Sequence, residues 1–188
     1  FICHNSLKSE IPVIENPGST LSESFRSLRT NLKYFIRDTQ CPVISVSSTI
    51  SAEGKTFVSV NLASILAMSG KKVLLIGLDL RKPRIHRIFD FKNESGLSNY
   101  LIGEEKYENV IIKTNVENLW YANSGPVPPN PAELIESDEM TVFISRAKKE
   151  FDYIVIDTPP VAIVTDALLV SPFTDFYIFV IRQRYSSK

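Results

Sequence analysis

Four short apolar runs divide the sequence, and each is rich in β-branched, leucine or aromatic side chains. None alternates cleanly between apolar and polar positions, and proline stays outside all of them. Near-continuous apolar strands are typical of a parallel sheet that is covered on both faces. The runs span residues 43–46, 73–76, 153–156 and 176–181.

Helical patterns lie between these runs. Residues 56–69 predict a helix that ends at Gly70, residues 131–149 predict one or two helices, and residues 165–170 predict a short one. Alternation of strand and helix predicts an α/β, doubly wound, mostly parallel sheet with helices on both faces.

The N-terminal part of the chain departs from that alternation. Residues 1–20 are polar and interrupted by proline, so we expect an extended arm or linker there and one domain over 21–188. Residues 21–37 predict an amphipathic helix with one apolar face and one basic face. The basic face carries Arg26, Arg29, Lys33 and Arg37.

Length and charge narrow the class of protein. The 188 residues fit one domain, and 21 basic against 21 acidic residues give no net charge. This balance argues against a nucleic-acid partner, which requires a basic excess. No apolar run is long enough to span a membrane.

The first residue, Phe1, is not Met, so we expect an internal cut or a processed start. Cys3 and Cys41 form no metal-binding pattern, and we expect reduced thiols.

The strongest chemical signal follows the first apolar run and opens the first predicted helix. It reads Ser51-Ala52-Glu53-Gly54-Lys55-Thr56. In a P-loop, backbone N–H groups and the helix N-terminus bind phosphate, the lysine reaches the β- and γ-phosphates, and the hydroxyl ligates Mg²⁺. Thr49 replaces the usual first glycine and Ala52 stands where another is expected, and a Cβ there limits positive φ.

Two carboxylates follow other strands of the predicted sheet. Asp157 comes directly after residues 153–156, and Asp79 follows residues 73–76 closely. Because ligands of open parallel sheets bind beyond the carboxyl ends of the strands, both should meet Lys55 at one edge. Each aspartate alone could equally be a turn or cap residue, but the three together favour a Mg²⁺–nucleotide site.

Together these motifs resemble the cytoplasmic kinase domain of bacterial tyrosine kinases that regulate capsule and exopolysaccharide synthesis. The resemblance covers about residues 21–188. Besides the P-loop it rests on four segments of the sequence. These are Gly77-Leu78-Asp79-Leu80-Arg81, Ile156-Asp157-Thr158-Pro159-Pro160, Asn130-Pro131-Ala132-Glu133-Leu134 and the Glu-x2-Arg-x2-Arg element Glu23, Arg26, Arg29.

The resemblance implies a P-loop NTPase-like fold, ATP and Mg²⁺ as cofactors, and transfer of the γ-phosphoryl group to tyrosine on a neighbouring copy. It implies Lys55, Asp79 and Asp157 as catalytic residues, and Thr56, Asp79 and Asp157 as the Mg²⁺ site. Arg81 either orients a phosphate or pairs with an aspartate. The implied nucleotide-binding residues are Ser51, Ala52, Glu53, Gly54, Lys55, Thr56, Phe57 and Arg81.

The resemblance also implies partners and a location. The partners are other copies in a ring, a transmembrane activator fused upstream or separate, and a cognate tyrosine phosphatase. The location is the inner face of the bacterial cell membrane, in the cytoplasm, within a larger membrane protein. Glu23, Arg26 and Arg29 would join the copies. Without the resemblance the same basic face reads as a solvated surface, and contact with anionic lipid is a third interpretation.

The sequence departs from the family at several positions. Gly77 replaces the first aspartate of the second acidic motif, so Asp79 would serve alone. The family's C-terminal tyrosine cluster is either cut off or absent from this sequence, and Tyr185 is either a phosphorylation site or plain surface. Ile50 stands where the related partitioning ATPases carry a second lysine, which favours a kinase. An ATP-binding scaffold with little kinase activity and an ATPase switch remain the alternatives.

Overall fold

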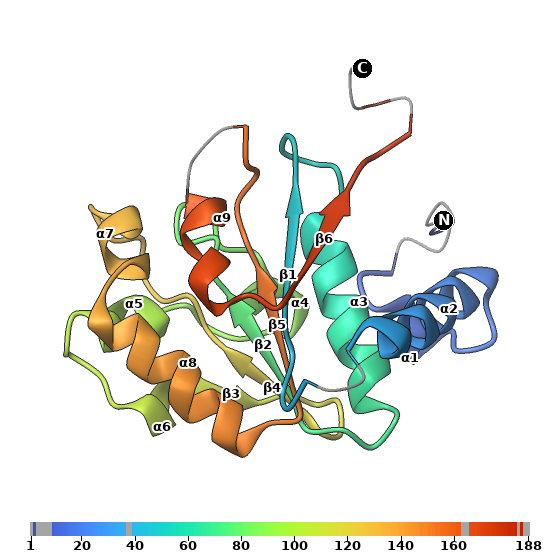
Figure 1. The fold of residues 1–188 in the computed structure, drawn as a ribbon, viewed down its shortest axis with the longest axis horizontal. Helices are drawn as coiled ribbons and strands as arrows, with labels where there is room; N and C mark the ends of the chain where they lie inside the picture. The colour runs from blue at the N-terminus through green and yellow to red at the C-terminus, as the bar shows by residue number, and fades with distance from the viewer. Residues whose placement is uncertain (1, 3–8, 37–38, 163–165, 184, 186–188) are drawn as a thin grey trace.

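The computed structural model describes residues 2, 9–36, 39–162, 166–183 and 185. It contains one six-stranded sheet in the order β3-β4-β2-β5-β1-β6, in which only the pairing of β3 with β4 is antiparallel (Figure 1). The strands are β1 Val43–Ser48, β2 Val73–Gly77, β3 Ile111–Lys113, β4 Leu119–Ala122, β5 Tyr153–Asp157 and β6 Phe176–Val180. The predicted doubly wound, mostly parallel sheet is therefore confirmed.

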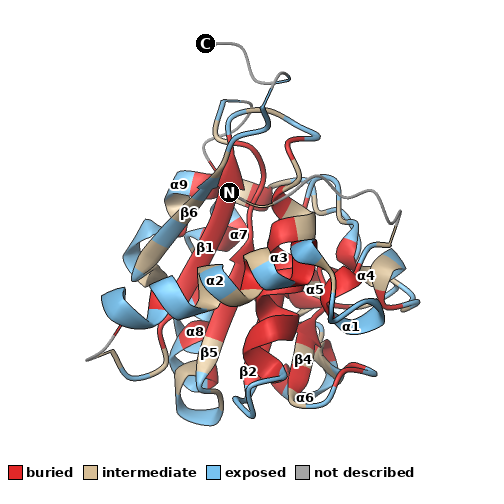
Figure 2. Ribbon diagram, turned by 90° about the vertical axis from the view of Figure 1, so that its right-hand side faces the viewer, coloured by how far each residue is buried: buried red, intermediate tan, exposed pale blue. Residues whose placement is uncertain are grey.

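Helices cover the two faces of the sheet and enclose two apolar clusters. One face packs against α1 Pro12–Glu15, α2 Thr20–Phe35, α3 Lys55–Ala67 and α4 Ile85–Ile88. The other packs against α5 Leu97–Leu101, α6 Tyr107–Val110, α7 Pro131–Ile135, α8 Asp138–Glu150 and α9 Asp166–Leu169, and a 3₁₀ turn at Ser171–Phe173 leads into β6. The central strands and most of α3 are buried (Figure 2).

The register of the strands places the predicted site residues at one end of the sheet, where the parallel strands have their carboxyl ends. β2 pairs with β5 so that Gly77 lies opposite Asp157, and β5 pairs with β1 so that Asp157 lies opposite Val46. The carboxyl ends of these three strands therefore lie side by side. The loop that leaves β1 and the loop that leaves β2 both open over the same end of the sheet (Figure 1).

Residues 9–20 differ from the extended arm that the sequence predicts. Pro12 occupies the first turn of α1, and Val13 is fully buried against the helices that follow. Asn61 of α3 fixes this segment, because its Oδ1 accepts from Val13 N at 3.4 Å and its Nδ2 donates to Glu10 O at 2.9 Å. The prediction was wrong for these described residues because burial of a short apolar segment outweighs its polar surroundings.

Strand β6 is also less covered than predicted. It forms the edge of the sheet beside β1. Tyr177 and Phe179 are each about half exposed, at 48% and 49%, while the alternate residues are partly buried. The prediction of cover on both faces is therefore correct for β1, β2 and β5 and wrong for β6. An aromatic-rich run does not distinguish an edge strand from a central one.

Candidate nucleotide-binding site

The loop between β1 and α3 has the backbone of a phosphate cradle. Ala52 adopts φ 67° and Gly54 adopts φ 98°, so the chain turns twice through the left-handed region before α3 begins at Lys55. Glu53 steadies the turn from within, because its Oε2 accepts from Ile50 N at 2.9 Å. Ala52 thus adopts the conformation that its Cβ disfavours, and the missing glycine does not prevent the loop from forming.

Lys55 lies between the two predicted carboxylates. Its Nζ donates to Asp79 Oδ2 at 3.0 Å and lies 3.8 Å from Asp157 Oδ2. Asp157 also accepts from Thr56 Oγ1 at 2.8 Å and from Ser59 Oγ at 3.0 Å. Three separate chain segments, at the ends of β1, β2 and β5, therefore converge as the sequence predicts. Ser59 was missed there, although it lies one helical turn from Lys55, to whose carbonyl it donates at 2.9 Å.

These charges are largely removed from water. The side chains of Lys55, Asp79 and Asp157 are 11%, 13% and 4% exposed. Burial raises the pKa of the Asp157 carboxyl above its ordinary value, although Lys55 and the hydroxyls of Thr56 and Ser59 oppose that rise. An ammonium group that bridges two buried carboxylates leaves this group of three with one excess negative charge.

The donor set fits Mg²⁺. Hydroxyl and carboxylate oxygens are the protein ligands that this cation prefers, and they are supplied here by Thr56, Asp79 and Asp157. The excess negative charge of the cluster also favours a further cation beside Lys55. The residues present are therefore suited to hold Mg²⁺ beside a phosphate group.

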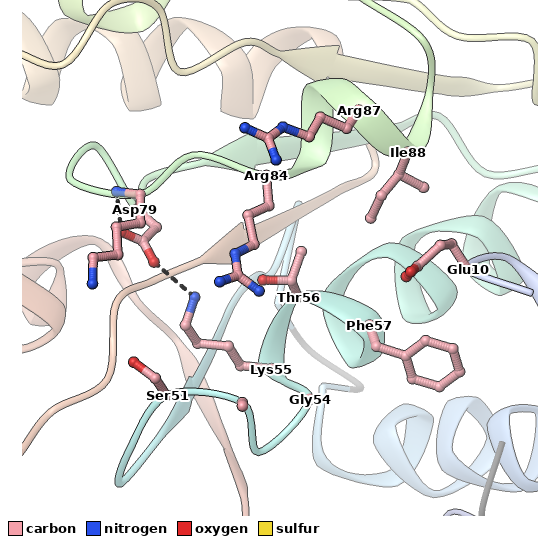
Figure 3. Close-up of a pocket in the computed structure, with 12 residues that line it drawn as sticks. Glu10, Ser51, Gly54, Lys55, Thr56, Phe57, Asp79, Arg84, Arg87 and Ile88 are labelled. Carbon is pink, nitrogen blue, oxygen red and sulfur yellow. Dashed lines mark hydrogen bonds and ion pairs between the residues drawn. The ribbon is translucent and has the colours of Figure 1, made fainter. Parts of the chain in front are cut away.

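A cavity of about 630 Å³ opens over the cradle (Figure 3). It extends from the P-loop past Lys55 and Thr56 to the start of α4. Figure 3 shows the Lys55 side chain directed to Asp79. It also shows the Arg84 side chain extending from the start of α4 toward Thr56. The lining residues are Glu10, Ser51, Ala52, Gly54, Lys55, Thr56, Phe57, Asp79, Lys82, Arg84, Arg87 and Ile88.

Two predicted nucleotide-binding residues have other contacts. Arg81 pairs with Asp166, its Nε donating to Oδ2 at 2.8 Å and its Nη2 to Oδ1 at 3.1 Å. The structure therefore favours the second alternative for Arg81, pairing with an aspartate, and the cavity is not lined by it. Phe57 does line the cavity, and its ring meets Phe25 of α2 edge to face at 5.9 Å.

Gly77 lies where a side chain has little space. A Cβ built there would lie 2.7 Å from Ser124 Oγ and 3.0 Å from the Tyr121 hydroxyl. Ser124 Oγ also donates to Gly77 O at 2.8 Å. Tyr121 of β4 and Ser124 in the loop after it would therefore have to move to admit an aspartate at this position.

The predicted assembly residues form intramolecular contacts. Arg26 pairs with Glu23 one turn earlier on α2, and Arg29 Nη1 donates to Ile65 O of α3 at 3.2 Å. Tyr185 is 48% exposed, with the Arg182 guanidinium 5.2 Å from its ring centre. Arg37 lies outside the described residues. Whether Glu23, Arg26 and Arg29 join copies, and whether Tyr185 is modified, stay predictions.

The sequence analysis missed the residues on the far side of the cavity. Arg84, at the N-terminal cap of α4, and Arg87 within that helix line the cavity. Lys82, which lies between Asp79 and Arg84 in the sequence, lines it as well. The available signal was the density of basic residues directly after the second acidic motif. The sequence analysis gave Asp166 no role, because nothing local connects it to Arg81, 85 positions away.

Comparison with known proteins agrees with this geometry. Residues 41–187 match a family model described as an AAA domain. The "Putative tyrosine-protein kinase CapB" of Staphylococcus aureus is 39% identical over 96% of this chain and 79% of its own length. The "Tyrosine-protein kinase YwqD" of Bacillus subtilis is 35% identical over 97% of this chain and 77% of its length. The "Tyrosine-protein kinase etk" of Escherichia coli is 35% identical, but this chain spans only 23% of it.

Solved structures have the same fold. The kinase domain of Escherichia coli tyrosine kinase ETK superposes with a TM-score of 0.90 at 34% identity, over 94% of this chain and 69% of that one. The chimerical protein CapA2B2 gives 0.86 at 39% identity, over 90% and 75%. The septum site-determining protein MinD of Pyrococcus horikoshii, solved with Mg-ADP, gives 0.63 at 27% identity, over 74% and 57%. The chain belongs to the bacterial tyrosine-protein kinases, whose kinase domain is of the P-loop type.

Proposed function

We propose that this domain binds Mg-ATP and transfers the γ-phosphoryl group to tyrosine, principally on a neighbouring copy, and so controls capsule or exopolysaccharide synthesis. The observation that carries the proposal is the convergence of Lys55, Thr56, Asp79 and Asp157 beside the phosphate cradle. The relatives named tyrosine-protein kinases, at 35–39% identity over most of this chain, support it.

Each side chain has a distinct task in this proposal. Lys55 exchanges its carboxylate contact for the β- and γ-phosphate oxygens, and the N–H groups of residues 52–56 bind the remaining phosphate oxygens. Thr56, Asp79 and Asp157 would hold Mg²⁺, which would supply positive charge against the phosphates. The phenolic oxygen of tyrosine forms a bond to the γ-phosphorus while the bond from that phosphorus to the β–γ bridging oxygen breaks. Asp79 accepts the phenolic proton, because Gly77 supplies no carboxylate.

The decisive experiment removes the charge of Lys55. The Lys55→Met variant and wild-type protein are incubated with Mg-ATP and a tyrosine peptide, and phosphotyrosine is measured by immunoblot. We expect loss of phosphotyrosine in the variant with an unchanged circular-dichroism spectrum. Lys71→Met, which changes an exposed lysine, is the matched control.

Three results would overturn the proposal. Full activity of Lys55→Met would remove this lysine from the reaction. Release of inorganic phosphate by the wild-type protein without any phosphotyrosine would indicate an ATPase switch instead. Nucleotide binding with neither product would indicate a scaffold.

The proposal extends to partners and location. We place the domain at the inner face of the bacterial cell membrane, with a transmembrane activator and other copies of the chain, and opposed by a tyrosine phosphatase. The crystallised chimera named CapA2B2 supports a partner protein. Within the part of the chain that the structure describes, no helix is long and apolar enough to cross a membrane. Co-purification of this chain with membranes from its own host, with and without the activator gene, tests the proposed location.

A further inference from the structure

Three basic residues border the cavity on the side away from the P-loop. Lys82, Arg84 and Arg87, here called the α4 rim, follow Asp79 in the chain and are all exposed. In Figure 3 the Arg84 side chain extends from the start of α4 toward Thr56, and Arg87 lies beyond it on the same helix. The rim is therefore part of the wall of the nucleotide cavity, although the kinase mechanism above gives it no task.

The charge of the rim is not balanced within the described residues. Lys55 is paired with Asp79, and Arg81 with Asp166, whereas no ion pair between the described residues includes Lys82, Arg84 or Arg87. Glu10 is the acidic lining residue left once Asp79 is assigned to Lys55. Three cations against one carboxylate make this wall attractive to anions.

The rim is held in place by its backbone. Lys82 N donates to Asp79 Oδ1 at 3.0 Å, which connects the rim to a predicted Mg²⁺ ligand. Ile85, at the start of α4, is buried at 1% exposure and anchors the helix in the core. Only the ends of the arginine side chains are then free to adjust to a ligand.

The position of the rim indicates what it meets. A P-loop lysine and the following hydroxyl act on the β- and γ-phosphates, so the terminal phosphate lies on the Lys55–Thr56 side of the cradle. Arg84 faces Thr56 from across the cavity (Figure 3). An acceptor hydroxyl must approach the γ-phosphorus from beyond the terminal phosphate. The chain segment that carries the acceptor therefore passes the rim.

We infer that the α4 rim binds acidic side chains that flank the acceptor tyrosine, so that the substrate class is an acidic tyrosine-containing peptide. The inference rests on the proposed kinase function, whose site it shares. Guanidinium groups suit this task because their planar N–H pairs match carboxylate geometry. Specificity then comes from residues outside the cluster that performs the phosphoryl transfer.

Two peptides test the inference. They share one tyrosine and one sequence except that four flanking residues are Glu in the first and Gln in the second. The proteins are wild type, the rim variant Arg84→Gln with Arg87→Gln, and a control with the same charge change, Lys71→Gln with Lys106→Gln. Both control lysines are exposed and do not line the cavity. Fluorescence anisotropy measures peptide binding, steady-state kinetics measure phosphorylation, and calorimetry measures Mg-ADP binding.

We expect wild type and control to prefer the Glu peptide by about tenfold, the sum of a few exposed ionic contacts, in both binding and kcat/KM. The rim variant should lose most of that preference through KM while its Mg-ADP affinity stays within about twofold. The wild-type preference should also fall at high salt, because the contacts are exposed.

Other outcomes overturn one proposal without the other. Equal wild-type affinity for both peptides contradicts the inference, as does a preference that survives in the rim variant. Equal losses for both peptides with weaker Mg-ADP binding would instead assign the rim to the nucleotide. If neither peptide is phosphorylated but the Glu peptide binds through the arginines, the kinase proposal fails and the rim inference stands.

Discussion

Two groups of charged residues in this molecule use the same chemistry in opposite surroundings. At the carboxyl end of the sheet, Lys55 and two aspartates are almost fully buried and contact one another. On α2, Glu23 is 62% exposed and Arg26 31% exposed, and the pair lies on a helix surface. Burial makes each charge in the first group depend on its neighbours, whereas water compensates the charges in the second.

The comparison separates two kinds of evidence for function. A buried cluster of charges is expensive to form, so its presence in a fold already indicates a task such as nucleotide binding. A solvated pair on a helix contributes only about 0.2–0.5 kcal/mol and indicates nothing by itself. For α2 a function can be demonstrated only with the partner present. Substitutions in the buried cluster should therefore have larger effects than substitutions on α2.

The largest effect should follow Asp157→Asn. The change keeps the shape of the side chain but removes the charge that Thr56 and Ser59 donate to and that would hold Mg²⁺. We expect Mg²⁺-dependent phosphotransfer to fall by at least about 100-fold, as for other charge-stabilising groups. Asp90→Asn, at an exposed left-handed position that asparagine tolerates, is the control. Phosphotransfer of Asp157→Asn within tenfold of wild type would contradict the assignment.

The second effect concerns a carboxylate added to the buried group. Gly77→Asp should destabilise the fold by more than Gly77→Ala, because the Cβ meets Ser124 Oγ and a charge is buried as well. We expect about 1–3 kcal/mol for the alanine alone, measured by urea unfolding. Adding Ser124→Ala to Gly77→Asp should restore part of the loss. If the single Gly77→Asp variant is as stable as wild type, the side chains of Tyr121 and Ser124 can move aside at little cost in free energy.

A smaller effect is expected on α2. Glu23→Ala with Arg26→Ala should change stability by less than about 0.5 kcal/mol, whereas Arg29→Ala should cost about 1 kcal/mol because its hydrogen bond to Ile65 O is lost. If these residues also join copies, the triple variant elutes later than wild type in size-exclusion chromatography. An identical elution volume would show that Glu23, Arg26 and Arg29 do not join copies of the chain.

The smallest effect is expected at Tyr185. Its ring is half exposed and contacts the Arg182 guanidinium, well outside the buried cluster. Tyr185→Phe should leave phosphorylation of an external peptide within about twofold of wild type, since surface changes rarely exceed 0.5 kcal/mol. Mass spectrometry after incubation with Mg-ATP tells whether the wild-type hydroxyl itself receives phosphate. A large loss of peptide phosphorylation would place Tyr185 in the site.

The sequence predicted the parts of the fold that local patterns determine. Apolar runs rich in β-branched residues identified β1, β2, β5 and β6, and the position of Asp79 and Asp157 after two of them predicted their meeting with Lys55. The strands β3 and β4 were missed, because Ile111–Lys113 has only two apolar residues and Leu119–Ala122 lacks the β-branched side chains of the other runs.

Contacts between distant segments could not be predicted. The pairing of Arg81 with Asp166 and the filling of the space at Gly77 by Tyr121 depend on how loops meet after folding. The α4 rim was missed for another reason. Exposed arginines are common on any surface, and only the folded structure shows that Arg84 and Arg87 line the cavity.

Ala52 has a consequence for the stability of the cradle. A methyl-bearing residue at φ 67° carries roughly 1–2 kcal/mol of local strain, which contacts elsewhere in the fold must compensate. The hydrogen bond from Ile50 N to Glu53 Oε2 is one contact within the loop that offsets this cost. Ala52→Gly would relieve this strain and favour the same loop conformation, so the methyl group is a cost that the rest of the fold carries.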